Sequence, residues 1–403
     1  MITVDTDSFF AIVVVAALAA ITVATVPKRF APPVVVLELV MGVVIGPQVL
    51  GLAHSDDFVN FFANLGLGML FFFAGYEIDF ERIKGRPLEL GALGWLLSVF
   101  LAYAIGGLLA AAGIVLSFLY TGSAMATTAI GTLIPILRDN GELRTRFGTY
   151  LLAAGGAGEF GPILLVTLVL STDNPLHESA ILLAFVALAL ALALVSVRYA
   201  WRGWPALERT FEASSQLAVR VTVVLIFGLV LLAGDLGLDI LLGGFVAGMI
   251  TRLALKGHEL AVFESKLTAV GFGFFVPFFF VTSGIEFDLD ALASVGALAK
   301  LLLFFVLFLV VRGIPAMLLY RKVLTVRDRA ALAFYCATEL PLVVAITTIA
   351  IDEGHMETST AAGLVGAAML STLIYPFVGM ALRKRSGGPS PEVAISGEPA
   401  AAA

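Results

Sequence analysis

Charge is what this chain has little of. Only 13% of its 403 residues are charged, whereas 60% are hydrophobic, and the mean hydropathy is +1.02. Soluble globular domains carry about a quarter of their residues as charged side chains. The composition therefore excludes a soluble protein and predicts an all-α polytopic membrane protein.

Side chains that build disulfides and metal centres are scarce as well. The single cysteine, Cys336, cannot form an internal disulfide. The four histidines, His54, His177, His258 and His355, lie between apolar runs at unrelated spacings, so no resident metal or other cofactor is expected. No basic residue precedes the first apolar run, which argues against a cleavable signal peptide.

Apolar runs long enough to cross a bilayer are abundant. Thirteen can be drawn, at about 8–26, 31–50, 58–78, 89–112, 114–138, 147–171, 178–198, 216–234, 238–254, 264–284, 293–319, 327–351 and 360–382. Lys and Arg gather after the odd-numbered runs and acids after the even-numbered ones. The positive-inside rule then predicts an integral protein of the plasma (inner) membrane, with its N-terminus outside and its C-terminus in the cytoplasm. We expect the lipid bilayer as its environment and no nucleic acid as a partner.

The two halves of the chain show a weak internal repeat. The segment around Glu77 matches the one around Glu286 at an offset of 209, and the segment at Asp139 matches the one at Asp352 at an offset of 213. Because about 210 residues amount to seven runs, the second half enters the membrane from the opposite face. This indicates an inverted repeat of six plus six helices, joined by a linker helix at about 178–198.

The fifth and twelfth runs, which the repeat pairs, both look discontinuous. The fifth has polar residues at Ser123, Thr127 and Thr128, and the twelfth contains Glu339 followed by Pro341. Interrupted helices in corresponding halves are the best sequence indication of a transport site. We place the helix breaks at Ser123 and Pro341. The threonine hydroxyls are hard oxygen ligands for a small cation, unless each one bonds its own helix backbone.

The sixth run carries an acid near its middle, Glu159, inside the sequence GGAGEFGP. An ionised side chain at that depth costs roughly 2.5–3.5 kcal/mol, so an intramembrane acid indicates function. Pro162 lacks an N–H, which leaves the carbonyl of Gly158 without its helical partner, and the glycines let another helix backbone approach. We interpret Glu159 as the seat of a proton and of a monovalent cation. The alternative is a protonated acid that hydrogen-bonds between helices.

Two further charges interrupt apolar runs. Arg312 lies about eight residues from the nearest basic cluster, so we expect it to pair with an internal carboxylate, Glu159 or Glu339. Glu38 faces either a water-filled cavity or a neighbouring helix, and the sequence does not choose between them. The tail at 386–403 is rich in Gly, Pro, Ser and Ala and is expected to be disordered.

Five segments together resemble the second branch of the monovalent cation:proton antiporters, which includes sodium/proton antiporters and the membrane part of Kef-type potassium efflux systems. They are APPVVVLELVMGVVIGPQVLGL, FFFAGYEIDFERIKGR, ATTAIGTLIPILRDNGEL, PFFFVTSGIEFDLDAL and ATELPLVVAI.

The resemblance implies one antiporter domain at 1–385 with thirteen helices and two crossing discontinuous helices. It implies a scaffold at about 1–84 and 200–290, a core at about 88–171 and 293–382, and a homodimer. By position, Glu159 matches the family's essential acid, Thr127 and Thr128 match its hydroxyl pair, and Arg312 matches its basic residue. Gly158 stands where many members have a second polar or acidic residue.

These features favour a secondary antiporter, not an enzyme, that exchanges protons for Na⁺ or Li⁺, or for K⁺, by alternating access. The missing acid pair favours electroneutral exchange, unless Glu339 supplies the second acid. The alternative is a Kef-type potassium/proton efflux protein gated by a separate regulatory subunit. A channel and an intramembrane enzyme fit less well, because neither a selectivity-filter sequence nor a catalytic constellation is evident.

Overall fold

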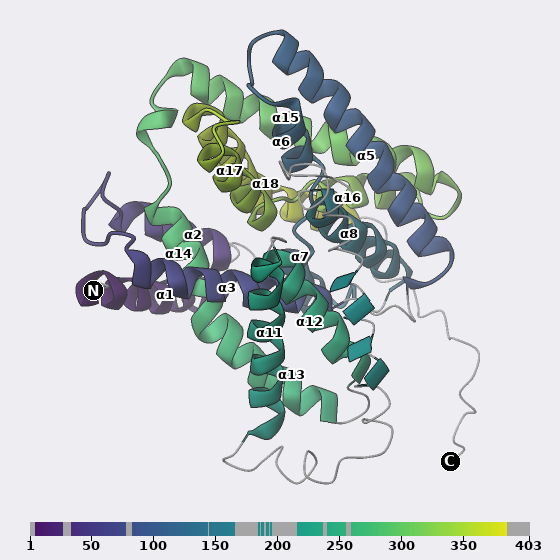
Figure 1. Cartoon of the computed structure of the whole chain (residues 1–403). Helices are drawn as coiled ribbons and strands as arrows, with labels where there is room; N and C mark the ends of the chain where they lie inside the picture. Colours follow the sequence, from purple (N-terminus) through teal and green to yellow (C-terminus); the bar gives the residue numbers. More distant parts are fainter. Residues whose placement is uncertain are drawn as a thin grey trace, which may run out of the picture.

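The computed structural model describes residues 5–26, 34–77, 83–143, 145–165, 216–236, 240–254 and 259–384, with short stretches between 184 and 195. All regular structure in these ranges is helical (Figure 1). The helices are α1 (Thr6–Thr25), α2 (Val34–Ile45), α3 (Asp57–Tyr76), α5 (Arg86–Ala111), α6 (Phe118–Met125), α7 (Ile130–Asp139), α8 (Arg146–Leu165), α11 (Leu217–Asp235), α12 (Ile240–Ala254), α13 (Glu259–Val270), η2 (Gly271–Phe275), α14 (Val276–Ile285), η3 (Asp290–Leu292), α15 (Val295–Leu319), η4 (Tyr320–Lys322), α16 (Val326–Cys336), α17 (Pro341–Asp352) and α18 (Thr358–Lys384).

The helices confirm a membrane protein. Within the described ranges, eight helical segments are long and apolar enough to span a bilayer, and three shorter apolar segments accompany them. The linker helix expected at about 178–198 and the tail at 386–403 lie largely or wholly outside the described residues. The number thirteen and the repeat therefore stay predictions.

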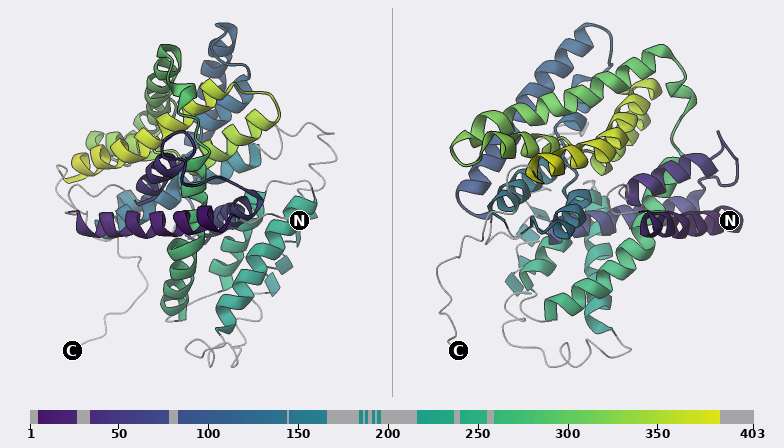
Figure 2. Two further views of the ribbon diagram at one scale, coloured as in Figure 1. Left: turned by 90° about the vertical axis from the view of Figure 1, so that its left-hand side faces the viewer. Right: turned by 180° about the vertical axis from the view of Figure 1, so that it is seen from behind.

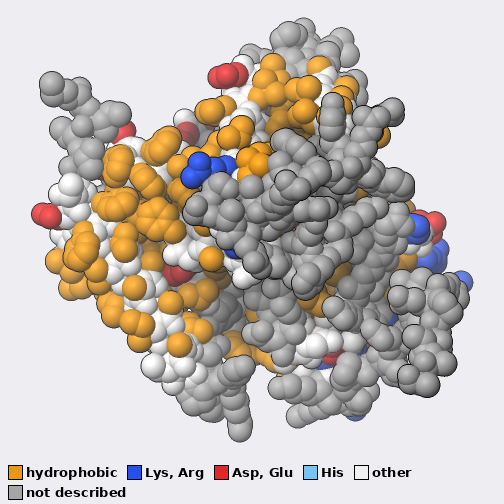
Figure 3. Space-filling view, turned by 90° about the horizontal axis from the view of Figure 1, so that it is seen from below, with side chains coloured by type: hydrophobic (Ala, Val, Ile, Leu, Met, Phe, Trp, Pro, Cys, Tyr) orange, Lys and Arg blue, Asp and Glu red, His pale blue; other side chains and the backbone are white. Residues whose placement is uncertain are grey.

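Large apolar side chains cover the outer surface of the helices. Phe100 is 70% exposed, Leu108 72% and Val224 72%. Figure 3 shows hydrophobic side chains spread over one flank of the molecule. A soluble monomer rarely exposes apolar patches of that extent, so this surface fits contact with lipid chains.

The described helices pack in two groups, seen from three sides in Figures 1 and 2. The first, called the scaffold group here, contains α1–α3 and α11–α14. The second, the core group, contains α5–α8 and α15–α18. The most extensive packing lies within each group, and α3, α12 and α2 touch the core group at α7, α8 and α18. The domain boundaries expected from the sequence remain a prediction.

Glycines bring the scaffold helices into backbone contact. A Cβ added at Gly75 of α3 would lie 2.0 Å from the Phe245 carbonyl oxygen of α12, and one at Gly248 would lie 2.0 Å from that of Phe72. Gly42 of α2 meets the Val281 carbonyl of α14 in the same way, at 2.2 Å. Between apolar helices in lipid, small residues of this kind allow the close packing that holds a bundle together.

Two helices of the core group are interrupted in the same way. Between α6 and α7 the chain leaves the helix at 126–129, and between α16 and α17 it does so at 337–340, 211 positions later. Pro341 is the first residue of α17, as expected beside a break. The break expected at Ser123 was misplaced, because Ser123 lies inside α6 and its hydroxyl pairs with that of Tyr103 at 3.1 Å.

The far ends of these interrupted helices also match. α7 ends at Asp139 and α17 at Asp352, and each is followed by a glycine in the left-handed region, Gly141 at φ +69° and Gly354 at φ +72°. Only glycine adopts that conformation without strain, which makes it the usual residue after a helix end. The matched sequence segments thus form matched local structures.

A buried ionic cluster ties one end of the core group together. The Arg383 guanidinium, 4% exposed, donates to Glu142 at 2.8 and 3.0 Å and to Asp328 at 2.5 Å, and lies 4.3 Å from the centre of the Phe147 ring. Glu142 belongs to the α7–α8 loop, Asp328 to the first turn of α16 and Arg383 to the last turn of α18. The cluster thus joins one half of each interrupted helix to α18.

Candidate functional site

Pro162 shapes α8 beside Glu159. The carbonyl of Gly158 has no proline N–H to bond within the helix, and instead it accepts the backbone N–H of Thr128 at 2.9 Å. The sequence predicted a free carbonyl here. In the structure this carbonyl binds the first helix break, so α8 is bonded to the chain between α6 and α7 at Thr128.

The second break binds to the first. The backbone N–H of Ala129 donates to the carbonyl of Thr338 at 2.8 Å. Glu339 follows Thr338, as Glu159 follows Gly158, so each acid lies one residue beyond a hydrogen bond to 128–129. Ser371 of α18 accepts the Glu339 N–H at 3.0 Å, and the Thr372 hydroxyl donates to the Glu339 carbonyl at 3.1 Å.

Both acids are buried where the two breaks meet. Glu159 is 3% exposed and Glu339 0%. The backbone N–H of Ile130, the first residue of α7, donates to the Thr128 carbonyl at 3.1 Å and lies close to the Glu159 carboxylate. The Oε2 atom of Glu159 has no hydrogen-bond partner among the described residues. A helix N-terminus favours negative charge. The Glu159 carboxylate therefore lies near a helix N-terminus with its Oε2 atom open to a further ligand.

Arg312 of α15, also buried, reaches the same place without forming the expected ion pair. Its Nε and Nη2 donate to the Thr128 hydroxyl at 3.1 and 2.8 Å, and Nη1 donates to Ser98 at 2.9 Å. Longer contacts, at 3.4 Å, go to the carbonyls of Cys336 and Ala154. Its hydrogen-bond acceptors within the described ranges are thus hydroxyls and carbonyls. The expected pairing with Glu159 or Glu339 is wrong as a direct contact, although Glu339 lies within electrostatic range.

Gly158 makes room for this arginine. A Cβ at that position would lie 2.3 Å from Arg312 Nη2 and 2.7 Å from the Thr128 hydroxyl oxygen. Likewise Gly155 faces the Ile130 side chain and Gly161 the Trp95 ring. The glycines of α8 were expected to admit another backbone, but these three mainly admit side chains.

We expect Gly158→Ala to push Arg312 away from Thr128 and to destabilise the protein by about 1–3 kcal/mol, the usual cost of overpacking. Thermal unfolding of the purified protein in detergent would measure this. Gly107→Ala is the matched control, because no neighbouring atom lies within 4 Å of a Cβ there. Equal melting temperatures for both variants would contradict the packing seen around Gly158.

The two threonines have different roles in this geometry. Thr128 accepts two N–H groups of Arg312 and donates to the Cys336 carbonyl at 2.6 Å, which leaves its hydroxyl no lone pair for a cation. It is therefore a link between the breaks, and its prediction as a cation ligand does not fit. The Thr127 hydroxyl donates to its own helix at the Ala124 carbonyl, 3.1 Å away, and lies near the Glu339 carboxylate. Having a single proton, it can serve only one of these acceptors, and its role as a ligand stays a prediction.

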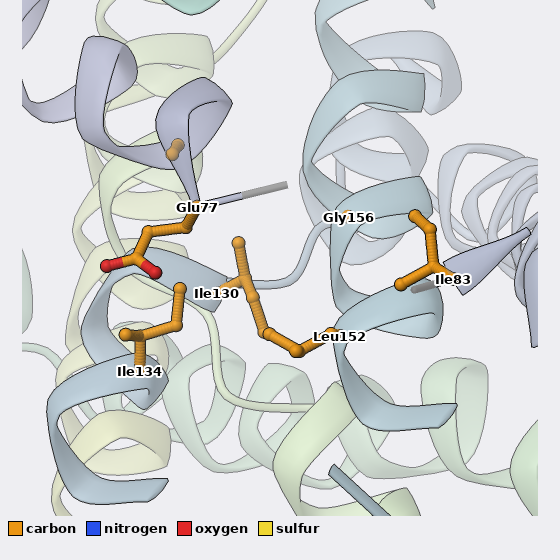
Figure 4. A pocket seen from close by; sticks show the side chains of 7 residues that line it. Glu77, Ile83, Ile130, Ile134, Leu152 and Gly156 are labelled. Atoms are coloured by element: carbon orange, nitrogen blue, oxygen red, sulfur yellow. The ribbon is translucent and has the colours of Figure 1, made fainter. Parts of the chain in front are cut away.

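A small cavity between α3, α7 and α8 lies next to Glu159. It has about 10 Å³ of space, close to what one water needs, and its lining includes Glu77, Ile83, Ile130, Ile134, Leu152 and Gly156. In Figure 4 the Glu77 carboxylate points toward Ile130 and Ile134. Ile130 lines the cavity at the N-terminus of α7, and Gly156 lines it from α8, three residues before Glu159.

Sequence reasoning missed Ser98, Ser371 and Thr372 as residues that hold the site. Each is a polar residue in the middle of an apolar run, which is the one local signal that could have identified them. Their partners, Arg312 and the Glu339 backbone, come from other helices, and no local pattern indicates such partners.

Comparison with known proteins gives consistent matches. The family model described as the transmembrane part of sodium/hydrogen exchangers matches residues 13–382. YjbQ of Bacillus subtilis is 25% identical over 383 residues, which are 90% of this chain but 61% of that protein. The Na⁺/H⁺–K⁺ antiporter GerN of Bacillus cereus is 29% identical over 276 residues, which are 66% of this chain and 68% of GerN.

The fold also matches a solved structure. The sodium proton antiporter MjNhaP1 of Methanocaldococcus jannaschii superposes with a TM-score of 0.63 at 16% identity, covering 94% of this chain and 99% of that one. At that identity the likeness concerns the helical fold alone.

Proposed function

The chain belongs to the sodium/hydrogen exchanger family, and from this membership we propose that it exchanges protons for monovalent cations across a membrane. The observation that carries the proposal is the Glu159 carboxylate. It is buried beside two helix breaks that are hydrogen-bonded to each other, lies near the N-terminus of α7 and has one oxygen without a partner among the described residues.

The proposed mechanism is competition for this carboxylate. With a proton bound, Glu159 is neutral, and with a monovalent cation bound it is neutral again. The bare, charged form pays the full desolvation cost of an intramembrane ion and stays in place. Movement of the core group against the scaffold group then carries one ion in each direction, by alternating access, without a chemical energy source. Hard oxygen ligands where the two breaks meet favour Na⁺ or Li⁺, and the similarity to GerN, a Na⁺/H⁺–K⁺ antiporter, gives a reason to include K⁺.

Arg312 supports electroneutral exchange. Its Nη2 would lie 2.3 Å from a Cβ at position 158, so this chain leaves no room there for the side chain of a second acid. One exchangeable carboxylate with a fixed positive charge nearby fits one proton for one cation. Glu339 is the residue that would change this stoichiometry, because both of its carboxylate oxygens lack hydrogen-bond partners among the described residues.

The remaining architecture is proposed as the sequence predicted it. The two breaks lie 211 positions apart, close to the offsets of 209 and 213 between the matched sequence segments. This spacing supports an inverted repeat of six plus six helices about a linker at about 178–198. The two packing groups support a core that moves against a scaffold. Homodimer formation, an N-terminus outside and a cytoplasmic C-terminus complete the proposal. A regulatory subunit of the Kef type is kept as the alternative.

The test is transport by the purified full chain in proteoliposomes. We expect a pH gradient to dissipate on addition of Na⁺ or Li⁺, with K⁺ compared at the same concentration. Clamping the membrane potential with valinomycin and K⁺ should leave the rate with Na⁺ unchanged if exchange is electroneutral. No response to any alkali cation would overturn the proposed function, whereas a strong dependence on potential would overturn only the stoichiometry.

A further inference from the structure

An apolar groove runs between α15 and α16 on the outside of the core group. Its volume is about 370 Å³, and it is lined by Leu309, Gly313, Ile314, Met317, Leu318, Ala330, Ala333 and Phe334. The groove is deep because the residues between the two helices are small: Gly313, Ala330 and Ala333. Ile314 is 38% exposed and Leu318 54%, so the groove opens toward the surroundings.

The length of the groove suits a lipid chain. From Leu309 to Leu318 the helix rises about 14 Å, at about 1.5 Å per residue. The groove reaches the turn at which α15 ends and η4 leads into α16. One of its ends therefore lies at the helix ends and the other lies deep in the apolar part of the bundle, as an acyl chain with its headgroup at the membrane surface would require.

Basic residues lie at the end of the groove where α15 ends and α16 begins. Arg321 and Lys322 form part of η4, and Arg327 and Arg329 follow in the first turn of α16. The one acid of this stretch, Asp328, is engaged by Arg383 at 2.5 Å and does not offset them. Four basic residues therefore lie within nine positions of the chain at this end of the groove.

Arg329 connects the charge to the groove. Its Nη1 donates to the carbonyl of Met317, a groove residue, at 2.6 Å, and its neighbour Ala330 forms part of the floor. Its Nε is buried, and its Nη2 makes no hydrogen bond to another described residue. An arginine fixed at one nitrogen with a donor left over is suited to a phosphate oxygen.

We propose that this groove is a binding site for one anionic phospholipid of the bilayer, with an acyl chain between α15 and α16 and the phosphate at Arg329. Basic pockets between transmembrane helices bind anionic headgroups in this way. The occupant is a bilayer lipid and not a free phosphate, because the groove is apolar along its whole length and only an acyl chain would fill it. The site is distinct from Glu159 and does not depend on which ion is transported.

Native mass spectrometry of the full-length protein, with phosphatidylglycerol or phosphatidylcholine added at equal concentration, tests the proposal. We expect one phosphatidylglycerol to be retained in preference to phosphatidylcholine, and inorganic phosphate not to displace it. Arg329→Gln should weaken retention about fivefold, the effect of about 1 kcal/mol per basic residue near a membrane surface. Ala330→Phe should fill the groove and abolish retention.

Matched controls keep the outcome decisive. Arg327→Gln removes a charge from the same helix, and Val306→Phe enlarges an exposed residue of α15 outside the groove, 56% exposed. Arg327→Gln should lower retention of the lipid less than Arg329→Gln does, and Val306→Phe should lower it less than Ala330→Phe does. Equal losses for Arg327→Gln and Arg329→Gln, undiminished retention in Ala330→Phe, or equal retention of the two lipids would each overturn the proposal. Transport activity is not needed for this test, so its failure is separate from a failure of the proposed function.

Discussion

Replacing Glu159 by glutamine is expected to reduce proton/cation exchange to the level of protein-free vesicles. The amide keeps the shape of the side chain but can neither release a proton nor carry the negative charge that a cation requires. Exchange would be measured as the Na⁺-induced collapse of a pH gradient in proteoliposomes. Glu159→Asp, which keeps the charge on a shorter side chain, should retain part of the activity.

A folding control separates this loss from damage to the protein. Because Oε2 of Glu159 has no hydrogen-bond partner among the described residues, Glu159→Gln removes an expensive buried acid and breaks no observed side-chain contact at that atom. We therefore expect its thermal unfolding in detergent to match or exceed that of the unmodified protein. Retained exchange in Glu159→Gln, or complete loss in Glu339→Gln alone, would move the exchange site away from Glu159.

Replacing Arg383 by alanine is expected to give the largest loss of stability, about 3–5 kcal/mol. The substitution leaves Glu142 and Asp328 buried beside each other without the guanidinium that both contact at 2.8 and 2.5 Å. It also removes the cation from the Phe147 ring. Unfolding in detergent, followed by helical circular dichroism, would show a lowered melting temperature.

The charge origin of this loss can be tested by removing the whole cluster. The triple variant Glu142→Gln, Asp328→Asn, Arg383→Met leaves no buried charge there, and buried ion pairs replaced as a set often cost little. We expect it to be more stable than Arg383→Ala. A triple variant less stable than the single one would show that packing, not uncompensated charge, explains the effect.

The sequence indicated the interrupted helices but not where they break. The break of the fifth run was expected at Ser123, yet the helix continues to Met125, and the Ser123 hydroxyl bonds Tyr103 on α5. In the twelfth run the break falls directly before Pro341, since proline sets its own position through its missing N–H. A break caused by proline is local, whereas one that depends on a partner helix is not.

The same distinction applies to the site. Glu159 could be proposed as a site residue from the sequence because the cost of an acid in an apolar segment is a property of that segment. The partners of Arg312 could not be identified, because a long side chain chooses among all the helices that surround it. Charge alone suggested a carboxylate, and the structure shows that Thr128 and Ser98 take the guanidinium instead.

The sequence by itself determined that this protein is a bundle of membrane helices with one acid set in a glycine-rich, proline-kinked segment, because hydropathy and backbone chemistry act over neighbouring residues. Only the tertiary structure decided which groups meet that segment. The bond from Arg312 to Thr128 joins residues 184 positions apart, and that from Arg383 to Glu142 joins residues 241 apart. Contacts at such separations exist only once the helices have packed, so they depend on the shape of the whole bundle.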